Sequence, residues 1–172
     1  LQNVVLIRKK VEDLIAQYKG NEVAVYFRDL NNGPWFGINE KISFSPSSLL
    51  KVPLLMTYLK QAENLPGIFK KKVVYDLNGS ASSEKLKFNQ NFVSVYEQLK
   101  LGETYTIEEL LTRMIIASDN EAAILLFASI KPELRNETYQ DLGLAVPQPE
   151  INENFMRVKD YATFFRILFN SS

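Results

Sequence analysis

One serine and one lysine lie close together in a setting that suits nucleophilic chemistry. Ser48 and Lys51 are three residues apart in the run FSPSSLLKVPLL, which reads as an apolar helix, so their side chains share one face. A lysine among leucines is partly desolvated, which favours the neutral amine. A neutral amine can take the proton of a serine hydroxyl, and this is nucleophilic catalysis without histidine. The spacing alone is a weak pattern, since Ser82 and Lys85 repeat it in a polar stretch to which we assign no role.

A second group of polar residues lies at the junction of two apolar stretches. Ser118, Asp119 and Asn120 follow TIEELLTRMIIA and precede EAAILLFASI. The ordinary interpretation is structural, because Ser118 with Glu121 fits the capping box that opens many helices. The alternative is a functional turn, in which Ser118 relays a proton and Asn120 hydrogen-bonds a substrate amide.

The composition limits the other chemistry that the chain can perform. It contains no histidine and no cysteine, which excludes Ser-His-Asp and Cys-His triads and argues against zinc and iron–sulfur sites. We therefore expect no cofactor and no metal. The 20 basic and 20 acidic residues balance, which argues against nucleic acid as a partner. No apolar run reaches the length of a membrane-spanning helix.

An amphipathic helix and a hairpin open the chain. Apolar residues recur every three or four positions up to Tyr18, which predicts a helix that ends at Gly20. The alternating run of residues 22–30, the turn residues NNG and the run 34–38 predict a β-hairpin.

Helices are expected to hold both motifs in place. The helix that carries Ser48 should begin near Ser45 and Pro46, which suit the cap and the first helical position, and end near Glu63. A capping box of Thr106 and Glu109 should open the helix that enters Ser118. The remaining predicted elements are a helix from Pro132 to Gly143, a last amphipathic helix over 158–168, and loops over 76–91 and 146–154.

Together the two motifs resemble those of the class A β-lactamase and penicillin-binding protein superfamily of active-site serine hydrolases, whose signature includes S-x-x-K and S-D-N. FSPSSLLKVPLL is similar to the nucleophile helix of that family. YTIEELLTRMIIASDNEAAILL is similar to the family's helices that enter and leave S-D-N, and MRVKDYATFFRIL resembles the helix that follows. The resemblance covers nearly the whole chain.

The resemblance implies an α+β fold in which a helical domain packs on a mostly antiparallel sheet. This chain would be mostly helical and would supply only the first hairpin of that sheet. We expect a single β-lactamase-like domain over residues 1–172, divided into a helix and hairpin of the sheet subdomain (1–40) and a helical subdomain (41–172).

The resemblance also implies a role for each motif residue. Ser48 would be acylated, Lys51 would transfer its proton, and Ser118 would pass a proton towards the leaving nitrogen. Asn120 would bind the side-chain amide of the substrate, and Asp119 would brace the loop.

The chain departs from the family pattern in two places. The family's K-T-G does not occur in the 172 residues, so we expect a C-terminally incomplete domain, inactive alone and able to associate with the missing segment. The loop LGLAVPQPEINENF (142–155) lacks the E-x-x-L-N that positions the hydrolytic water in class A β-lactamases, and Glu150 and Glu153 are weak local candidates for that base.

The sequence thus predicts a β-lactamase-like serine hydrolase that acts outside the cytoplasmic membrane on β-lactams. The first alternative is a penicillin-binding D-alanyl-D-alanine carboxypeptidase or endopeptidase that acts on peptidoglycan peptides. A second is a β-lactam-sensing domain without catalysis. A third is an unrelated helical module with two accidental motifs, which predicts that Ser48 and Ser118 lie far apart.

Overall fold

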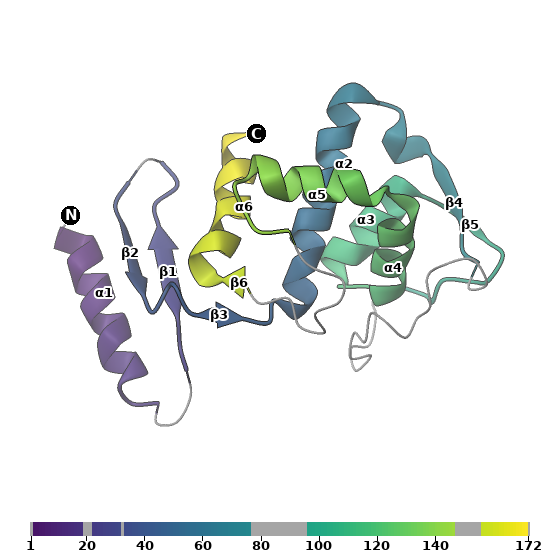
Figure 1. Ribbon diagram of the computed structural model, residues 1–172. Helices are drawn as coiled ribbons and strands as arrows, with labels where there is room; N and C mark the ends of the chain where they lie inside the picture. Colours follow the sequence, from purple (N-terminus) through teal and green to yellow (C-terminus); the bar gives the residue numbers. More distant parts are fainter. Residues whose placement is uncertain (1, 19–21, 32, 77–95, 147–155, 172) are drawn as a thin grey trace. The chain divides into compact units, whose positions relative to one another are not determined.

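The computed structural model describes residues 2–18, 22–31, 33–76, 96–146 and 156–171, which form two compact units. The hairpin unit holds the described residues up to Pro46 and those from Met156 on. The helical unit holds those from Ser47 to Val146 (Figure 1). Contacts thus group the last helix with the hairpin, whereas the sequence led us to place residues 41–172 together. The single domain stays a prediction.

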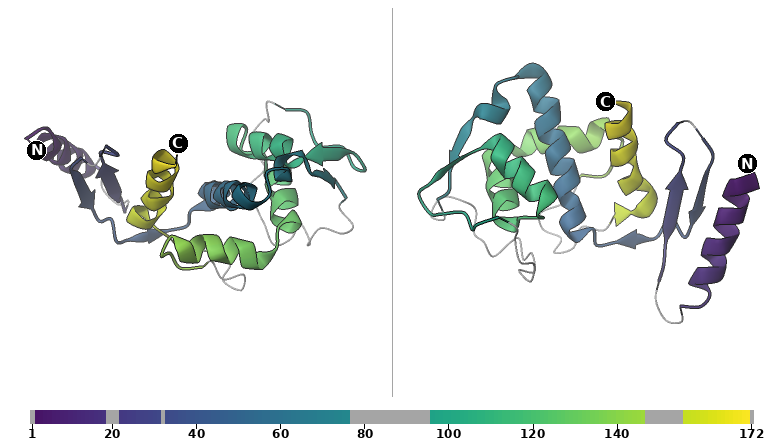
Figure 2. Two further views of the ribbon diagram at one scale, coloured as in Figure 1. Left: turned by 90° about the horizontal axis from the view of Figure 1, so that it is seen from above. Right: turned by 180° about the vertical axis from the view of Figure 1, so that it is seen from behind.

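The hairpin unit contains two antiparallel strand pairs. Its elements are α1 (Gln2–Ile15), β1 (Val25–Arg28), β2 (Trp35–Ile38), β3 (Ser43–Phe44), β6 (Met156–Arg157) and α6 (Val158–Asn170). β1 pairs with β2 so that Val25 faces Ile38, and the stacked rings of Phe27 and Phe36 are 5.3 Å apart. α1 lies beside β2, and α6 packs against β1 (Figure 2). The predicted opening helix, hairpin and last helix are confirmed, although α1 ends at Ile15 and not near Gly20 as predicted.

The helical unit holds both motifs. Its elements are the 3₁₀ turn η1 (Ser47–Leu50), α2 (Lys51–Asn64), the 3₁₀ turn η2 (Ile68–Lys70), β4 (Lys72–Val74), β5 (Thr104–Thr106), α3 (Ile107–Ile116), α4 (Asn120–Ser129) and α5 (Pro132–Asp141). α3 and α4 pack on each other, and α2 packs on both and on α5. These contacts bring the start of α2 to the junction of α3 and α4.

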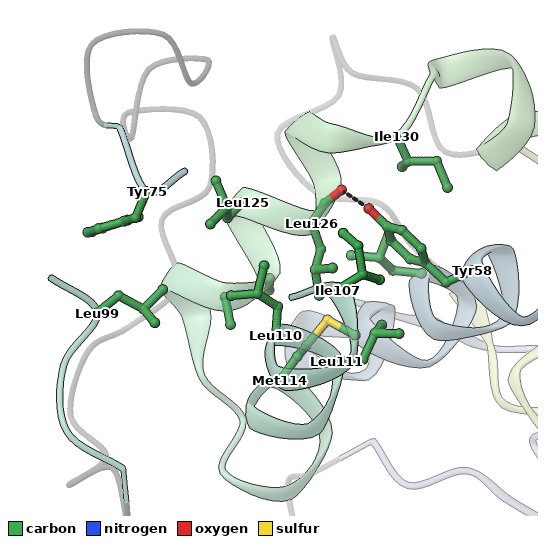
Figure 3. Close-up of a cluster of buried hydrophobic side chains, with 13 residues drawn as sticks. Tyr58, Tyr75, Leu99, Ile107, Leu110, Leu111, Met114, Leu125, Leu126 and Ile130 are labelled. Atoms are coloured by element: carbon green, nitrogen blue, oxygen red, sulfur yellow. Dashed lines mark hydrogen bonds between the residues drawn. The ribbon is translucent and has the colours of Figure 1, made fainter. Parts of the chain in front are cut away.

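A buried apolar cluster holds these helices together (Figure 3). Leu110 of α3 and Leu126 of α4 are fully buried, and Met114 is 1% exposed. Each such side chain contributes about 1.5–3 kcal/mol when removed from water. One polar contact lies inside the cluster, where the Tyr58 hydroxyl of α2 donates a hydrogen bond of 2.7 Å to the carbonyl of Leu126. The core thereby fixes α2, which begins at Lys51, against α4, which begins at Asn120.

The Tyr58 hydroxyl is expected to matter for stability. Tyr58→Phe leaves the buried Leu126 carbonyl without this donor, and such a loss costs about 1–3 kcal/mol. Tyr18→Phe is the matched control, because Tyr18 is 60% exposed and its change should stay within about 0.5 kcal/mol. Urea unfolding measures both free energies, and equal losses in the two variants would contradict the expectation.

Two predicted helix starts are confirmed by the backbone. Thr106 caps α3 and its side chain accepts from the Glu109 N–H, while the Glu109 carboxylate accepts from the Thr106 N–H, which completes the capping box. Pro132 stands in the first turn of α5, where its missing N–H costs nothing.

The predicted start of the Ser48 helix at Ser45 and Pro46 is wrong. α2 begins only at Lys51, and no side chain caps it. Ser47 takes a left-handed φ of 48°, which interrupts a helical path between Pro46 and Ser48. The four residues of η1 then lead into α2.

The strands extend beyond the single predicted hairpin. β3 pairs with β6, and β4 pairs with β5, both antiparallel. Strands of two or three residues are too short to show an alternating pattern, which is why the sequence did not reveal them. The predicted loops 76–91 and 146–154, with Glu150 and Glu153, fall almost wholly outside the described residues, as do Ser82 and Lys85. Among the described helices, none is both long and apolar enough to cross a membrane.

Candidate active site

Ser48 is an exposed side chain in the 3₁₀ turn that precedes α2. A 3₁₀ turn has three residues per turn, so side chains three apart are eclipsed. Ser48 therefore stands over the start of α2, directly before Lys51 in the helical path.

Lys51 is the buried base candidate of the site. It is 4% exposed, and its Nζ lies within hydrogen-bond distance of three oxygens from the α3–α4 junction. The distances are 2.5 Å to the Ser118 carbonyl, 2.9 Å to the Ser118 hydroxyl and 2.6 Å to Asn120 Oδ1. These contacts join the S-x-x-K and S-D-N motifs, contrary to the interpretation of two accidental motifs.

Burial sets the acidity of this lysine. Desolvation lowers the pKa of Lys51 from its ordinary value, and the negative charge of Asp119 partly offsets this by raising it. The net direction is downward, which favours the neutral amine. Lys51 is thus suited to accept a proton.

The turn between α3 and α4 presents Ser118 to Lys51. Ser118 has a left-handed φ of 53°, uncommon for a residue with a side chain and a feature that concentrates at functional sites. This backbone makes the predicted cap at Ser118 wrong, because an N-cap residue needs an extended conformation. Asp119 has that conformation, and its Oδ1 accepts from the Ala122 N–H at 3.1 Å. The Ser118 hydroxyl is consequently left to face Lys51.

Asp119 is held by a second partner that the sequence did not predict. Its Oδ2 receives a 2.8 Å hydrogen bond from Nε of Arg113, and both side chains are largely buried. The two residues are six positions apart across a helix end, a spacing that matches no helical side-chain pair. The sequence therefore carried no signal for this ion pair.

The described part of the site brings together groups that can transfer a proton. No group of three or more described carboxylates could hold a metal ion. The structure brings Lys51, Ser118 and Asn120 into contact and sets Ser48 one turn before Lys51. The arrangement offers the exposed hydroxyl of Ser48 and the desolvated amine of Lys51. A second hydroxyl, that of Ser118, and the amide of Asn120 are hydrogen-bonded to that amine.

Solved structures with the same fold include both β-lactamases and penicillin-binding proteins. A mutant of PBP-A, in its acyl-enzyme complex with penicillin G, is 19% identical with a TM-score of 0.72, over 100% of this chain and 63% of that one. A β-lactamase from Sphaerobacter thermophilus is 22% identical with a TM-score of 0.64, over 86% of this chain and 55% of that one. A D-alanyl-D-alanine carboxypeptidase from Mycobacterium tuberculosis is 20% identical with a TM-score of 0.61, over 88% of this chain and 60% of that one.

These likenesses establish the β-lactamase/transpeptidase-like α+β fold that the sequence predicted. The chain spans less than two thirds of the length of each of these structures. No curated protein matches its sequence. The model of the β-lactamase enzyme family matches residues 6–171, nearly the whole chain. The chain therefore belongs to the β-lactamase enzyme family.

Proposed function

We propose that the protein is a serine hydrolase of the class A β-lactamase type that opens β-lactams through an ester on Ser48. The observation that carries this proposal is the contact of the buried Lys51 with Ser118 and Asn120, one turn from an exposed serine. Family membership supports the same reaction type.

Acylation would begin with proton transfer from Ser48 to Lys51. The neutral amine takes the hydroxyl proton, Oγ of Ser48 bonds to the carbonyl carbon, and the carbonyl oxygen becomes an oxyanion. The first N–H groups of a helix have no partner within it and lie at its positive end, which favours such an anion. Ser48 lies in the first turn of the helical path that η1 begins and α2 continues, so its own backbone N–H is one of these groups.

Collapse of this intermediate would break the amide C–N bond and require a proton on the leaving nitrogen. Lys51, now protonated, donates to the Ser118 hydroxyl, and Ser118 passes its own proton to the nitrogen. Asn120 holds an amide of the substrate while Nζ of Lys51 orients its Oδ1. Water then hydrolyses the Ser48 ester, which restores the serine.

The second candidate function is a penicillin-binding D,D-peptidase, which β-lactams inhibit through a persistent ester. The absence of E-x-x-L-N from residues 142–155 favours it, because a slow hydrolytic step leaves the acyl-enzyme in place. Both functions act on β-lactams or peptidoglycan peptides, so we place the protein outside the cytoplasmic membrane. Two statements stay predictions: residues beyond this sequence supply K-T-G, and the 172 residues alone are inactive.

The time course of a penicillin adduct tests the proposal and separates the two functions. The full-length protein is mixed with a labelled penicillin, and its intact mass is followed from seconds to hours. A transient adduct with accumulating hydrolysed penicillin is expected for the β-lactamase. A lasting adduct would instead establish the penicillin-binding function. No adduct on the folded protein would overturn both and favour a sensor or binding domain.

A further inference from the structure

Arg113, in the last turn of α3, connects the S-D-N turn to a distant segment. Its Nε binds the Asp119 carboxylate at 2.8 Å, and its Nη2 donates to the carbonyl of Glu97 at 2.5 Å. Its guanidinium also lies 5.2 Å from the centre of the Tyr96 ring. The side chain of Arg113 is 12% exposed, so these contacts are made largely out of water.

The backbone of Arg113 also binds the same turn, through hydrogen bonds to its carbonyl. Its carbonyl accepts from the N–H of Ala117 at 3.0 Å and from that of Asp119 at 3.3 Å. Asp119 is thus bound through its N–H, through Oδ2 to Arg113 and through Oδ1 to Ala122. Ser118 lies between these anchors in its left-handed conformation, a backbone state that persists only where its surroundings enforce it.

The ion pair also changes the charge that Lys51 faces. Across the α3–α4 turn, the charged groups nearest in the chain are Asp119, Arg113 and Glu121, and Glu121 is engaged by the Tyr75 hydroxyl. The charge of Asp119 raises the pKa of Lys51. A guanidinium on Asp119 opposes that effect, because its own positive charge disfavours a second cation nearby.

We propose that Arg113 is a positioning residue for acylation: it locks the Ser118–Asn120 turn and offsets part of the charge of Asp119, so that Lys51 is set to take the proton of Ser48. This inference rests on the proposed function, in which Lys51 takes the proton of Ser48. Arg113 acts through Asp119 and touches neither the substrate nor Ser48 in this scheme.

Three variants separate the charge of Arg113 from its bulk. Arg113→Met removes the charge and keeps an apolar stem, whereas Arg113→Lys keeps the charge. Arg135→Met is the matched control, because Arg135 also donates to backbone carbonyls, those of Phe127 and Ile130, and stacks on Phe127. It binds no residue of the S-D-N turn in these contacts. Circular dichroism establishes which variants are folded.

The first readout is the rate of acylation of the full-length protein by a labelled penicillin across pH. Arg113→Met should acylate roughly three- to tenfold more slowly at neutral pH, with the midpoint of its rate–pH profile moved to higher pH. Arg113→Lys should keep the wild-type midpoint, and so should Arg135→Met. An unchanged midpoint in folded Arg113→Met would overturn the inference, since a purely structural role lowers only the active fraction.

The second readout does not depend on acylation. The Cε resonance of Lys51, assigned by its loss in Lys51→Met, is titrated by NMR in wild type and in Arg113→Met. A higher midpoint in Arg113→Met supports the inference even if no penicillin adduct forms, in which case the proposed function alone has failed. Identical midpoints overturn the inference, whatever the acylation result.

Discussion

Replacing Ser48 by alanine is expected to abolish the penicillin adduct. Ser48 is the exposed hydroxyl that stands one turn before the buried amine, so the variant lacks the atom to which the acyl group bonds. The loss should be complete, because the ester cannot form on another atom of that side chain. Intact mass after reaction with a labelled penicillin measures it directly.

Ser47→Ala is the matched control for this experiment. Ser47 is also exposed, and its left-handed φ of 48° imposes the same strain on alanine as on serine, since both carry a Cβ. The control should form the adduct at the wild-type rate. An adduct that survives in Ser48→Ala would show that the nucleophile is another residue.

Replacing Lys51 by methionine is expected to slow acylation about 100-fold to 10,000-fold. This is the usual range for removal of a positioned general base. Lys51→Arg should lose as much, although it keeps a cation, because a guanidinium stays protonated at every working pH. Lys60→Met is the control on the same helix, since Lys60 pairs with Glu137 and Asp141 and has no contact with the S-D-N turn in these pairs.

The pH dependence of the acylation rate shows which protonation state of Lys51 is active. Burial lowers the pKa of Lys51, and only the neutral amine acts as the base. The acylation rate of the wild type should therefore rise with pH through this lowered pKa and level off above it. Stopped-flow or quenched mass measurements across pH test the profile. A rate that falls through this range would mean that protonated Lys51 is the active form.

Local sequence determined much of the scaffold. The spacing of apolar residues predicted α1 and α6, the Thr106–Glu109 pair predicted the start of α3, and Pro132 predicted the start of α5. Each of these depends on interactions within about one turn of the chain, which sequence spacing describes directly. The S-x-x-K and S-D-N motifs, which are likewise short and local, were enough to indicate the family.

Backbone conformation decided two features that residue type could not. Serine suits a helix cap in general. The left-handed φ of Ser47 nevertheless places the start of the Ser48 helix after Pro46, and that of Ser118 leaves the cap of α4 to Asp119. Residue type gave no reason to expect φ above zero at either serine. The cap at Asp119 follows from that geometry.

The site itself was decided by tertiary structure. Lys51 meets Ser118 and Asn120 across 67 and 69 residues of chain, and Arg113 meets Asp119 across the end of a helix. Residue types and spacing predicted that S-x-x-K and S-D-N form one site. Only the packing of α2 on α3 and α4 sets the distances between the residues of the two motifs. The same packing removes Lys51 from water, and burial is the physical reason for its lowered pKa. The sequence alone thus determined which groups are present, and the fold decided which of them touch and lowered the pKa of Lys51.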